Sequence, residues 1–298
     1  MSAVNVALIT RRSALCVPAG DARRLAKALA SGADEVVVDL EDAVAYDDKE
    51  RARAQLAAFD FAADPGVQAG GTAVAVRVNA IGTPWCHRDI EAVASIGAIS
   101  SIVLPKVESR ADIGFVERLL DGLEAEDGRA APLGVQALVE TARGLADVAG
   151  IASDVRRLTG LVVGYADLAA SMGRSRDVEP TVWRAVQDAI VLHARAAGVA
   201  AVDGPFLGVA DDDAFRAATA AAARHGFDAK WVIHPRQVAA VNEAFMPTPD
   251  AVAHARDVLA ALADAAADGR GAAVLQGGLV DEAMARDARR ILGKVEGR

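Results

Sequence analysis

The sequence has few aromatic residues, few cysteines and no long apolar run. Aromatic side chains make up only 4% of its 298 residues and alanine is very frequent, which favours closely packed helices over an all-β sandwich. Its two cysteines, Cys16 and Cys86, form no CxxC pair, so we expect free thiols in a reducing compartment. Because neither a run of about 18 apolar residues nor a signal-peptide cleavage pattern occurs, we expect a soluble cytoplasmic protein without a membrane span.

Motifs that bind phosphate or zinc are also missing. No GxGxxG follows the first predicted strand and no GxxxxGK[ST] occurs, so dinucleotide-binding and P-loop functions have no support. The histidines are scattered and neither cysteine has a partner, so no zinc site is predicted. The formal net charge of −9 argues against a nucleic-acid-binding surface, and an anionic substrate would need local basic residues or a metal.

Short β-branched apolar runs, of the kind buried in a parallel sheet, recur at residues 13–18, 35–40, 73–79, 101–107, 133–139, 158–164, 199–203 and 230–234. Helix-like segments lie between them, at residues 22–31, 49–59, 113–124, 181–197, 213–225 and 235–245. Gly32, Gly198 and Gly226 stand where helices would end. Eight β/α units in about 235 residues predict an α/β fold, the TIM (β/α)₈ barrel. A doubly wound sheet is the alternative, which the lack of a break between two halves disfavours.

Two segments fall outside this repeat. Residues 61–72 read as a Pro/Gly loop after the second helix. We expect the barrel to occupy residues 1–247 and a C-terminal helical extension to occupy residues 248–298. The extension combines an Ala-rich helix at 250–268 with a Gly-rich hinge at 268–271, and it could serve as a packing or dimerisation element or as a lid.

Polar residues collect at the C-terminal ends of the predicted strands, where TIM barrels carry their catalytic groups. Asp39, Glu41 and Asp42 follow the second run, and Arg77 interrupts the third. A buried, unpaired guanidinium is very costly, so Arg77 must meet a carboxylate or an anionic ligand. A structural ion pair with Asp39 or Glu41 and a bidentate clamp on a substrate carboxylate both satisfy this requirement.

Glu140 and Asp167 lie at the ends of the fifth and sixth runs, one β/α unit apart. Two carboxylates there can converge on one hard cation, because Mg²⁺ typically takes one or two carboxylates plus waters and substrate oxygens. Ordinary rim salt bridges are the alternative that the spacing leaves open. His234 can likewise be a catalytic or an ordinary rim histidine. Basic residues near the first and fourth runs would suit a CoA phosphate if they gathered at the barrel mouth, namely Arg11, Arg12, Arg23, Arg24, Lys27 and Lys106.

Seven motifs then occur in a recognisable order: RRSALCVPAGD, VVVDLEDAV, VRVN, IVLPKVES, ALVETARGL, GYADLAASMG and GFDAKWVIHPRQVAAVNEAF. Together they resemble the citrate lyase β-subunit-like branch of the HpcH/HpaI aldolase family, the CoA-ester lyases. The resemblance runs from Arg12 to the C-terminus. It implies a TIM barrel that binds Mg²⁺, for which Mn²⁺ could substitute, and a substrate that carries CoA.

The resemblance assigns roles to individual positions. It implies that Glu140 and Asp167 bind Mg²⁺ and that Arg77 holds the substrate carboxylate. It also implies a CoA-binding mouth that includes Arg12 and Lys27. Supporting roles beside the metal or the CoA follow for the acidic residues of the second motif, Asp39, Glu41 and Asp42.

The segment QGGLVDEAM resembles the G-x-[ML]-[IV]-D lid motif of malyl-CoA and citramalyl-CoA lyases, and it puts the lid aspartate on Asp281. This chain departs from the usual motif by Leu279, by Val280 and by the lack of a following proline. In such lyases the aspartate reaches into the site of a neighbouring subunit. The resemblance therefore implies a homotrimer or hexamer.

The implied function is a Mg²⁺-dependent carbon–carbon lyase that cleaves or condenses a short 3-hydroxyacyl-CoA, such as malyl-CoA or citramalyl-CoA. The products would be acetyl-CoA and glyoxylate or pyruvate, with Asp281 moving the proton to or from the acetyl-CoA enolate. The alternatives are a citryl-CoA lyase, a malyl-CoA thioesterase and a metal-dependent pyruvate aldolase that uses no CoA. A catalytically idle CoA-binding subunit is the remaining alternative.

Overall fold

The computed structural model describes residues 10–175 and 180–296. The chain divides into two compact units, Met1–Asn242 and Glu243–Arg298, so the division falls a few residues before the boundary expected at 247. The first unit contains a closed barrel of eight strands in the order β1 to β8. Neighbouring strands are parallel, and β1 pairs with both β2 and β8. The predicted (β/α)₈ barrel is confirmed.

The strands lie close to the apolar runs of the sequence. They are β1 Ser13–Pro18, β2 Glu35–Asp39, β3 Ala73–Arg77, β4 Ile99–Leu104, β5 Gly134–Val139, β6 Leu158–Val163, β7 Ala200–Asp203 and β8 Ala229–Val232. Alternate side chains of these strands pack together in one buried cluster, which contains Val37, Ala75, Val103, Leu138 and Val162. Small and β-branched side chains of this kind fill the interior of a barrel without leaving a pore.

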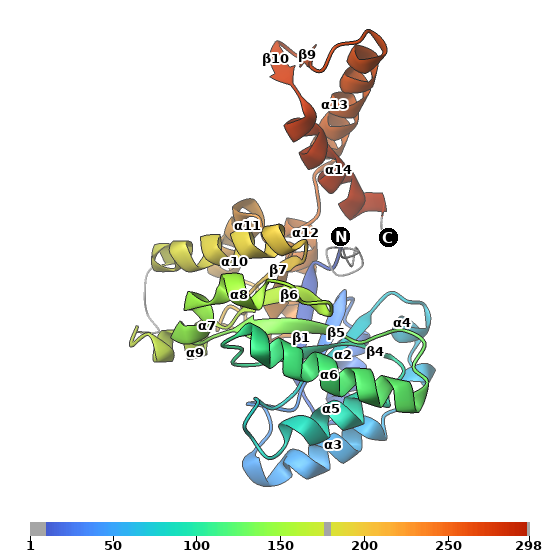
Figure 1. Ribbon diagram of the computed structural model, residues 1–298, viewed down its shortest axis with the longest axis vertical. Coiled ribbons are helices and arrows are strands. Elements are labelled where there is room, and N and C mark those ends of the chain that lie inside the picture. The colour runs from blue at the N-terminus through green and yellow to red at the C-terminus, as the bar shows by residue number, and fades with distance from the viewer. Residues whose placement is uncertain (1–9, 176–179, 297–298) are drawn as a thin grey trace. The chain divides into compact units, whose positions relative to one another are not determined.

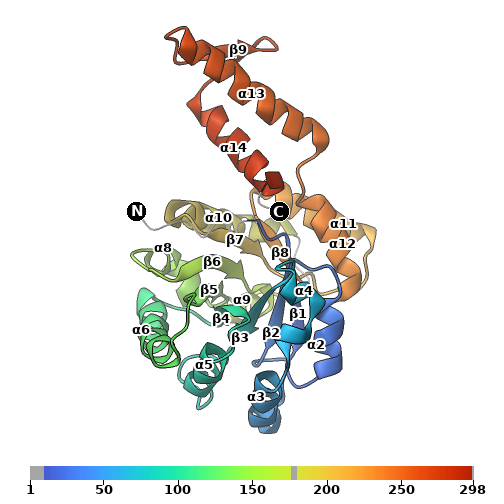
Figure 2. The ribbon, with the colours of Figure 1, turned by 90° about the vertical axis from the view of Figure 1, so that its right-hand side faces the viewer.

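Helices surround the strands, as Figures 1 and 2 show. They are α2 Ala22–Leu29, α3 Lys49–Ala57, α4 Pro65–Gln68, α5 Cys86–Ala94, α6 Arg110–Asp127, α7 Ala142–Ala146, α8 Val148–Ile151, α9 Tyr165–Ser171, α10 Arg184–Ala197, α11 Asp213–His225 and α12 Val238–Ala244. Single turns of 3₁₀ helix lie at Tyr46–Asp48 (η1), Phe61–Ala63 (η2), Pro180–Trp183 (η3) and Pro235–Gln237 (η4). Gly198 and Gly226 adopt the left-handed conformation at the ends of α10 and α11, as their positions predicted.

Residues 61–72, expected to form a loop, contain the two short elements η2 and α4. The reason is local capping. The side chain of Asp60 accepts a hydrogen bond from the backbone N–H of Ala63. The Asp64 carboxylate accepts from the N–H groups of Gly66 and Val67, and Pro65 occupies the first position of α4.

The second unit is a helical hairpin with a small β-hairpin between its helices. Helix α13 spans Pro249–Ala267, the strands β9 and β10 span Ala273–Leu275 and Gly278–Val280, and α14 spans Glu282–Glu296. Figures 1 and 2 show α13 and α14 side by side. The apolar core of this unit includes Ala255 and Val258 of α13, Val280 of β10, and Ala288 and Leu292 of α14. Among the described residues, no helix has both the length and the apolar composition that crossing a membrane requires.

Candidate active site

The side chains at the carboxyl ends of β2 and β3 form a tight ion pair. Asp39 and Arg77 are the last residues of these strands and lie opposite each other in the strand register. The Arg77 Nε and Nη2 atoms donate to Asp39 Oδ1 and Oδ2 at 2.8 and 2.5 Å. Asp39 is buried and also accepts from the backbone N–H groups of Glu41 and Ala43, at 2.8 and 3.1 Å. The structural ion pair considered for Arg77 is thus present in the protein.

Glu41 extends this pair toward the fourth strand. Its Oε2 lies 3.2 Å from Arg77 Nη1, and its Oε1 accepts a hydrogen bond from Lys106 Nζ at 2.6 Å. Glu41 is 6% exposed, and this burial raises the pKa of its carboxyl group against the opposing charges of Arg77 and Lys106. Asp42 is more exposed and lies at longer range, 3.8 Å from Arg77 Nη1 and 4.0 Å from Lys106 Nζ.

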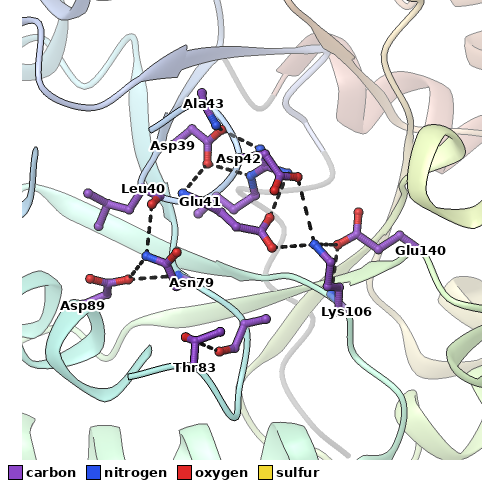
Figure 3. Close-up of polar contacts among 12 residues, drawn as sticks. Asp39, Leu40, Glu41, Asp42, Ala43, Asn79, Thr83, Asp89, Lys106 and Glu140 are labelled. Atoms are coloured by element: carbon purple, nitrogen blue, oxygen red, sulfur yellow. Dashed lines mark hydrogen bonds and ion pairs between the residues drawn. The ribbon is translucent and has the colours of Figure 1, made fainter. Parts of the chain in front are cut away.

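Lys106 links the two halves of the site. It follows β4 and lies between Glu41 and Glu140, as Figure 3 shows. Its backbone N–H donates to Glu140 Oε1 at 3.0 Å, and its Nζ lies 3.8 Å from the same oxygen. The residue has a positive φ of 53°, which non-glycine residues seldom adopt and which directs this N–H toward the carboxylate.

Glu140 and Asp167 follow the neighbouring strands β5 and β6, near enough for the charge of Asp167 to act on Glu140. Glu140 directly follows β5 and is 2% exposed, while Asp167 lies half-buried in the first turn of α9. Burial raises the pKa of Glu140 to about 8, and the negative charges of Glu41 and Asp167 add to the rise while Lys106 opposes it. Gly164 leaves the room for this arrangement, because a Cβ there would lie 2.5 Å from both Cβ and Oε2 of Glu140.

These side chains fit a divalent cation such as Mg²⁺. When all are ionised, the carboxylates of the site outnumber its cationic side chains Arg77, Lys106 and Lys49, which leaves the site negatively charged. These five carboxylates are Asp39, Glu41, Asp42, Glu140 and Asp167. A cation beside Glu140 would also offset the cost of burying that carboxylate. No group of three or more protein ligands is arranged for a metal in the described part of the chain. Two carboxylates suit Mg²⁺, which keeps waters and substrate oxygens in its coordination sphere.

Arg12 lies elsewhere. It precedes β1 and is therefore at the amino ends of the strands. Its Nε and Nη2 each donate to a carboxylate oxygen of Asp34 at 2.8 Å, and its Nη1 donates to the carbonyl of Asn242 at 3.2 Å. The expected contact of Arg12 with substrate would require it at the opposite end of the barrel, so we leave it out of the candidate site.

Three further residues considered from the sequence are outside the cluster. Lys27 is exposed in the last turn of α2. His234 caps η4, because its Nδ1 accepts from the backbone N–H of Arg236, which agrees with an ordinary rim histidine. Asp281 belongs to the second unit, where it is exposed and its Oδ1 accepts from the N–H groups of Ala283 and Met284 at the start of α14.

The central position of Lys106 did not follow from sequence patterns, in which it was only one of several basic residues near the predicted mouth. One feature of the chain points to it. It lies two residues beyond β4, at the end of the barrel that carries the carboxylates. The third cation, Lys49, fixes the loop after β2 by donating to the carbonyl oxygens of Leu40 and Glu41 at 2.8 and 2.5 Å.

Curated proteins of similar sequence include several lyases. An L-malyl-CoA/beta-methylmalyl-CoA lyase of Rhodobacter capsulatus is 38% identical over 287 residues, which cover 89% of this chain and 88% of that protein. A (3S)-malyl-CoA thioesterase of Cereibacter sphaeroides is 36% identical over 285 residues, which cover 96% of this chain and 94% of that protein. The same substrate name therefore appears in relatives with two different activities.

Among solved structures, CitE from Mycobacterium tuberculosis in complex with magnesium, acetoacetate and coenzyme A matches with a TM-score of 0.76 at 34% identity. The match covers 97% of this chain and all of that one. The family model for HpcH/HpaI aldolase/citrate lyase matches residues 12–235, three quarters of the sequence. The chain belongs to the HpcH/HpaI aldolase/citrate lyase family.

Proposed function

We propose that this protein is a Mg²⁺-dependent lyase that cleaves, or in reverse forms, the carbon–carbon bond of a short 3-hydroxyacyl-CoA such as malyl-CoA or citramalyl-CoA. The products of cleavage are acetyl-CoA and glyoxylate or pyruvate. The observation that carries this proposal is the buried Glu140 beside Asp167 at the carboxyl ends of β5 and β6. The kinship with malyl-CoA lyases supports the choice of substrate.

Glu140 and Asp167 hold the metal in this proposal. The bound ion supplies Lewis acidity toward the oxygens of the substrate. Arg77 binds the substrate carboxylate and fixes its orientation. The guanidinium has five N–H groups, so its contacts with Asp39 and Glu41 leave some of them available to bind the substrate. The same contacts fix the plane of the guanidinium.

Cleavage requires two proton movements. The hydroxyl group of the substrate gives its proton to solvent water as its carbon becomes the carbonyl of the oxo acid. The electron pair of the broken bond passes to the carbon beside the thioester, giving the enolate of acetyl-CoA. Asp281 then donates a proton to that carbon. The thioester is needed because it stabilises the enolate far better than a carboxylate would.

The remaining parts of the proposal concern assembly and location. Residues 248–298 act as a lid, and Asp281 acts in the site of a neighbouring subunit of a homotrimer or hexamer. Lys27 contacts the CoA portion of the substrate. We place the enzyme in the cytoplasm, where its two free cysteines, Cys16 and Cys86, suit reducing conditions.

A thioesterase is the second candidate, favoured by the malyl-CoA thioesterase among the relatives. It would need the same metal, but water would attack the thioester carbonyl and free CoA would leave. Citryl-CoA cleavage is a third candidate, since a citrate lyase beta subunit from M. tuberculosis with oxaloacetate and magnesium matches at 36% identity and a TM-score of 0.66. That match covers 80% of this chain.

Turnover of a panel of thioesters separates these candidates. The purified protein would be incubated with Mg²⁺ and malyl-CoA, citramalyl-CoA or citryl-CoA, and the products resolved by liquid chromatography. We expect acetyl-CoA and an oxo acid from malyl-CoA or citramalyl-CoA, and no products after EDTA. Free CoA with intact hydroxy acid would identify a thioesterase instead. No turnover of any thioester would contradict the proposal and leave a CoA-independent aldolase or a binding subunit.

A further inference from the structure

The hydroxyl group of Tyr165 connects three elements beside the candidate site. Tyr165 is the first residue of α9, the helix that also carries Asp167. Its hydroxyl donates to Asp203 Oδ1, at the end of β7, over 2.6 Å. The same oxygen accepts a hydrogen bond of 2.8 Å from Nε2 of Gln187 in α10. The start of α9 is therefore tied to both β7 and α10.

The far side of Asp203 is fixed as well. Lys230 in β8 donates from Nζ to Asp203 Oδ2 at 2.5 Å and to the carbonyl oxygen of Gly204 at 2.7 Å. Both charged residues are 3% exposed, so this ion pair is buried. Leaving a buried carboxylate oxygen without its hydrogen-bond donor is destabilising, so the hydrogen bond from Tyr165 to Asp203 Oδ1 contributes to stability.

The ring of Tyr165 is also confined. Gly204 lies against it so closely that a Cβ at this position would come within 2.7 Å of Tyr165 Cδ2. The indole of Trp183 meets the ring edge to face, with the ring centres 5.1 Å apart. Tyr165 is thus held by hydrogen bonds at its tip and by packing along its ring.

Asp167 has no comparable support. In the described part of the chain, no hydrogen bond or ion pair reaches its carboxylate, and its charge acts on Glu140 only at longer range. Its location is therefore set by the backbone of the first turn of α9. That turn begins at Tyr165, two residues earlier, and continues from Gly164, whose N–H donates to the carbonyl of Val139 at 3.1 Å.

We propose that Tyr165 is a positioning residue that orients Asp167 for metal binding through its hydrogen bonds to Asp203 and Gln187. The inference rests on the proposed role of Asp167 as a metal ligand. It makes the network of Tyr165, Asp203, Gln187 and Lys230 a support for the metal site, with none of these side chains proposed as a ligand.

Calorimetric titration of the full-length, metal-free protein with Mg²⁺, repeated with Mn²⁺, tests this inference. Tyr165→Phe removes the hydroxyl and keeps the ring. We expect it to weaken metal binding about tenfold or more, as loss of a partner that orients a ligand typically does. The KM for the CoA ester at saturating metal should stay within a factor of about two, since the CoA contacts are unchanged.

Two further variants complete the design. Tyr46→Phe is the matched control, because Tyr46 is 72% exposed and should keep wild-type metal affinity. Gln187→Leu removes one donor to the Tyr165 hydroxyl from another helix, and it should weaken metal binding in the same direction but less. If Tyr165→Phe does not fold, Gln187→Leu still allows the inference to be tested by metal titration. If the hydrogen bonds of the Tyr165 hydroxyl hold α9 in its orientation, both variants should bind the metal more weakly than the wild-type protein.

The outcomes separate the two proposals. If the wild-type protein binds neither ion, the proposed function itself fails. If the wild-type protein binds metal and both network variants bind it equally well, the inference fails alone. Lower thermal stability with unchanged metal affinity would likewise overturn it, because Tyr165 would then support only the fold.

Discussion

Burying Glu140 as an ionised carboxylate costs free energy, and few neighbouring groups offset that cost. It receives one backbone N–H bond from Lys106, and the nearest full positive charge, Lys106 Nζ, lies 3.8 Å away. The rise of its pKa to about 8 follows from burial first and then from the charges of Glu41 and Asp167. A group arranged in this way gains most from a cation, which is the reason to treat it as a ligand.

This pKa predicts how metal binding depends on pH. Glu140 is mainly protonated below pH 8 in the metal-free protein, whereas the metal requires the carboxylate. Mg²⁺ affinity should therefore rise by about tenfold per pH unit from pH 6 toward pH 8 and level off above it. Calorimetry at several pH values measures this, and proton release appears in buffers of different ionisation enthalpy. An affinity that does not vary with pH would contradict the assignment.

Glu140→Gln is the matched control for that titration. It keeps the size of the side chain and its acceptor for the Lys106 N–H, and it removes the titrating group. We expect both weak binding and no pH dependence in this variant. A wild-type pH profile that survives the substitution would locate the titrating group elsewhere.

At the scale of elements, the junction between β6 and α9 depends on Gly164. A Cβ there would meet Glu140 at 2.5 Å, so Gly164→Ala should displace Glu140, destabilise the protein by about 1–3 kcal/mol and abolish Mg²⁺ binding. Gly122→Ala within α6 is the control, because a Cβ there would meet no heavy atom within 4 Å apart from its chain neighbours and the backbone of its own helix. It should stabilise the protein by about 0.5–1 kcal/mol. Thermal unfolding and calorimetry measure both effects, and wild-type metal binding by Gly164→Ala would contradict the geometry.

The junction between β10 and α14 allows the proposed role of Asp281 to be separated from its structural role. Its carboxylate accepts hydrogen bonds from the N–H groups of Ala283 and Met284, and asparagine does this equally well. Asp281→Asn should therefore keep the unfolding temperature and lower lyase turnover by about a hundredfold or more. Asp281→Ala should lose the same turnover and, in addition, about 1 kcal/mol of stability. Normal turnover in Asp281→Asn would exclude its role as a proton donor.

Most elements of the barrel follow from the sequence because their signals are strong and local. Buried parallel strands appear as apolar runs, and β1 begins and ends where its run does. The alternation within β3 and the register with β2 explain why Arg77 meets Asp39, one of the two partners considered for it. Of the helices in the barrel unit, α4, α5, α7, α8 and α9 escaped prediction, and four of these five have seven residues or fewer, too short for a helical periodicity to emerge.

Other features depend on contacts that no local pattern carries. The β-hairpin of the second unit turns through Gln276 and Gly277, both at positive φ, whereas the usual hairpin signal is Asn-Gly or Asp-Gly. Lys106 acquires its central position only when the fourth strand lies between the third and the fifth. The motif that contains Arg12 ends at Pro18, and Pro18 rather than Arg12 lies at the carboxyl end of β1. The resemblance assigned the whole motif to the mouth, whereas the rule that a barrel mouth lies at the carboxyl ends of the strands places Arg12 away from it.

The whole molecule combines two units with separate apolar cores. The barrel unit contains all five carboxylates and all three cationic side chains of the candidate site, and the second unit contains Asp281. The proposed chemistry needs both units, since the barrel residues bind the substrate and metal while Asp281 supplies the proton. In the proposal, the barrel of one subunit works with Asp281 of a neighbouring subunit.

The most direct test of the central claim is the cleavage of L-malyl-CoA by the full chain in D₂O with Mg²⁺, followed by mass spectrometry of the products. A lyase that passes through the acetyl-CoA enolate must take up a solvent-derived hydrogen at the methyl carbon. We predict equal amounts of glyoxylate and acetyl-CoA, deuterium in the acetyl group, and no reaction after EDTA. Free CoA and malate without deuterated acetyl-CoA would contradict the account.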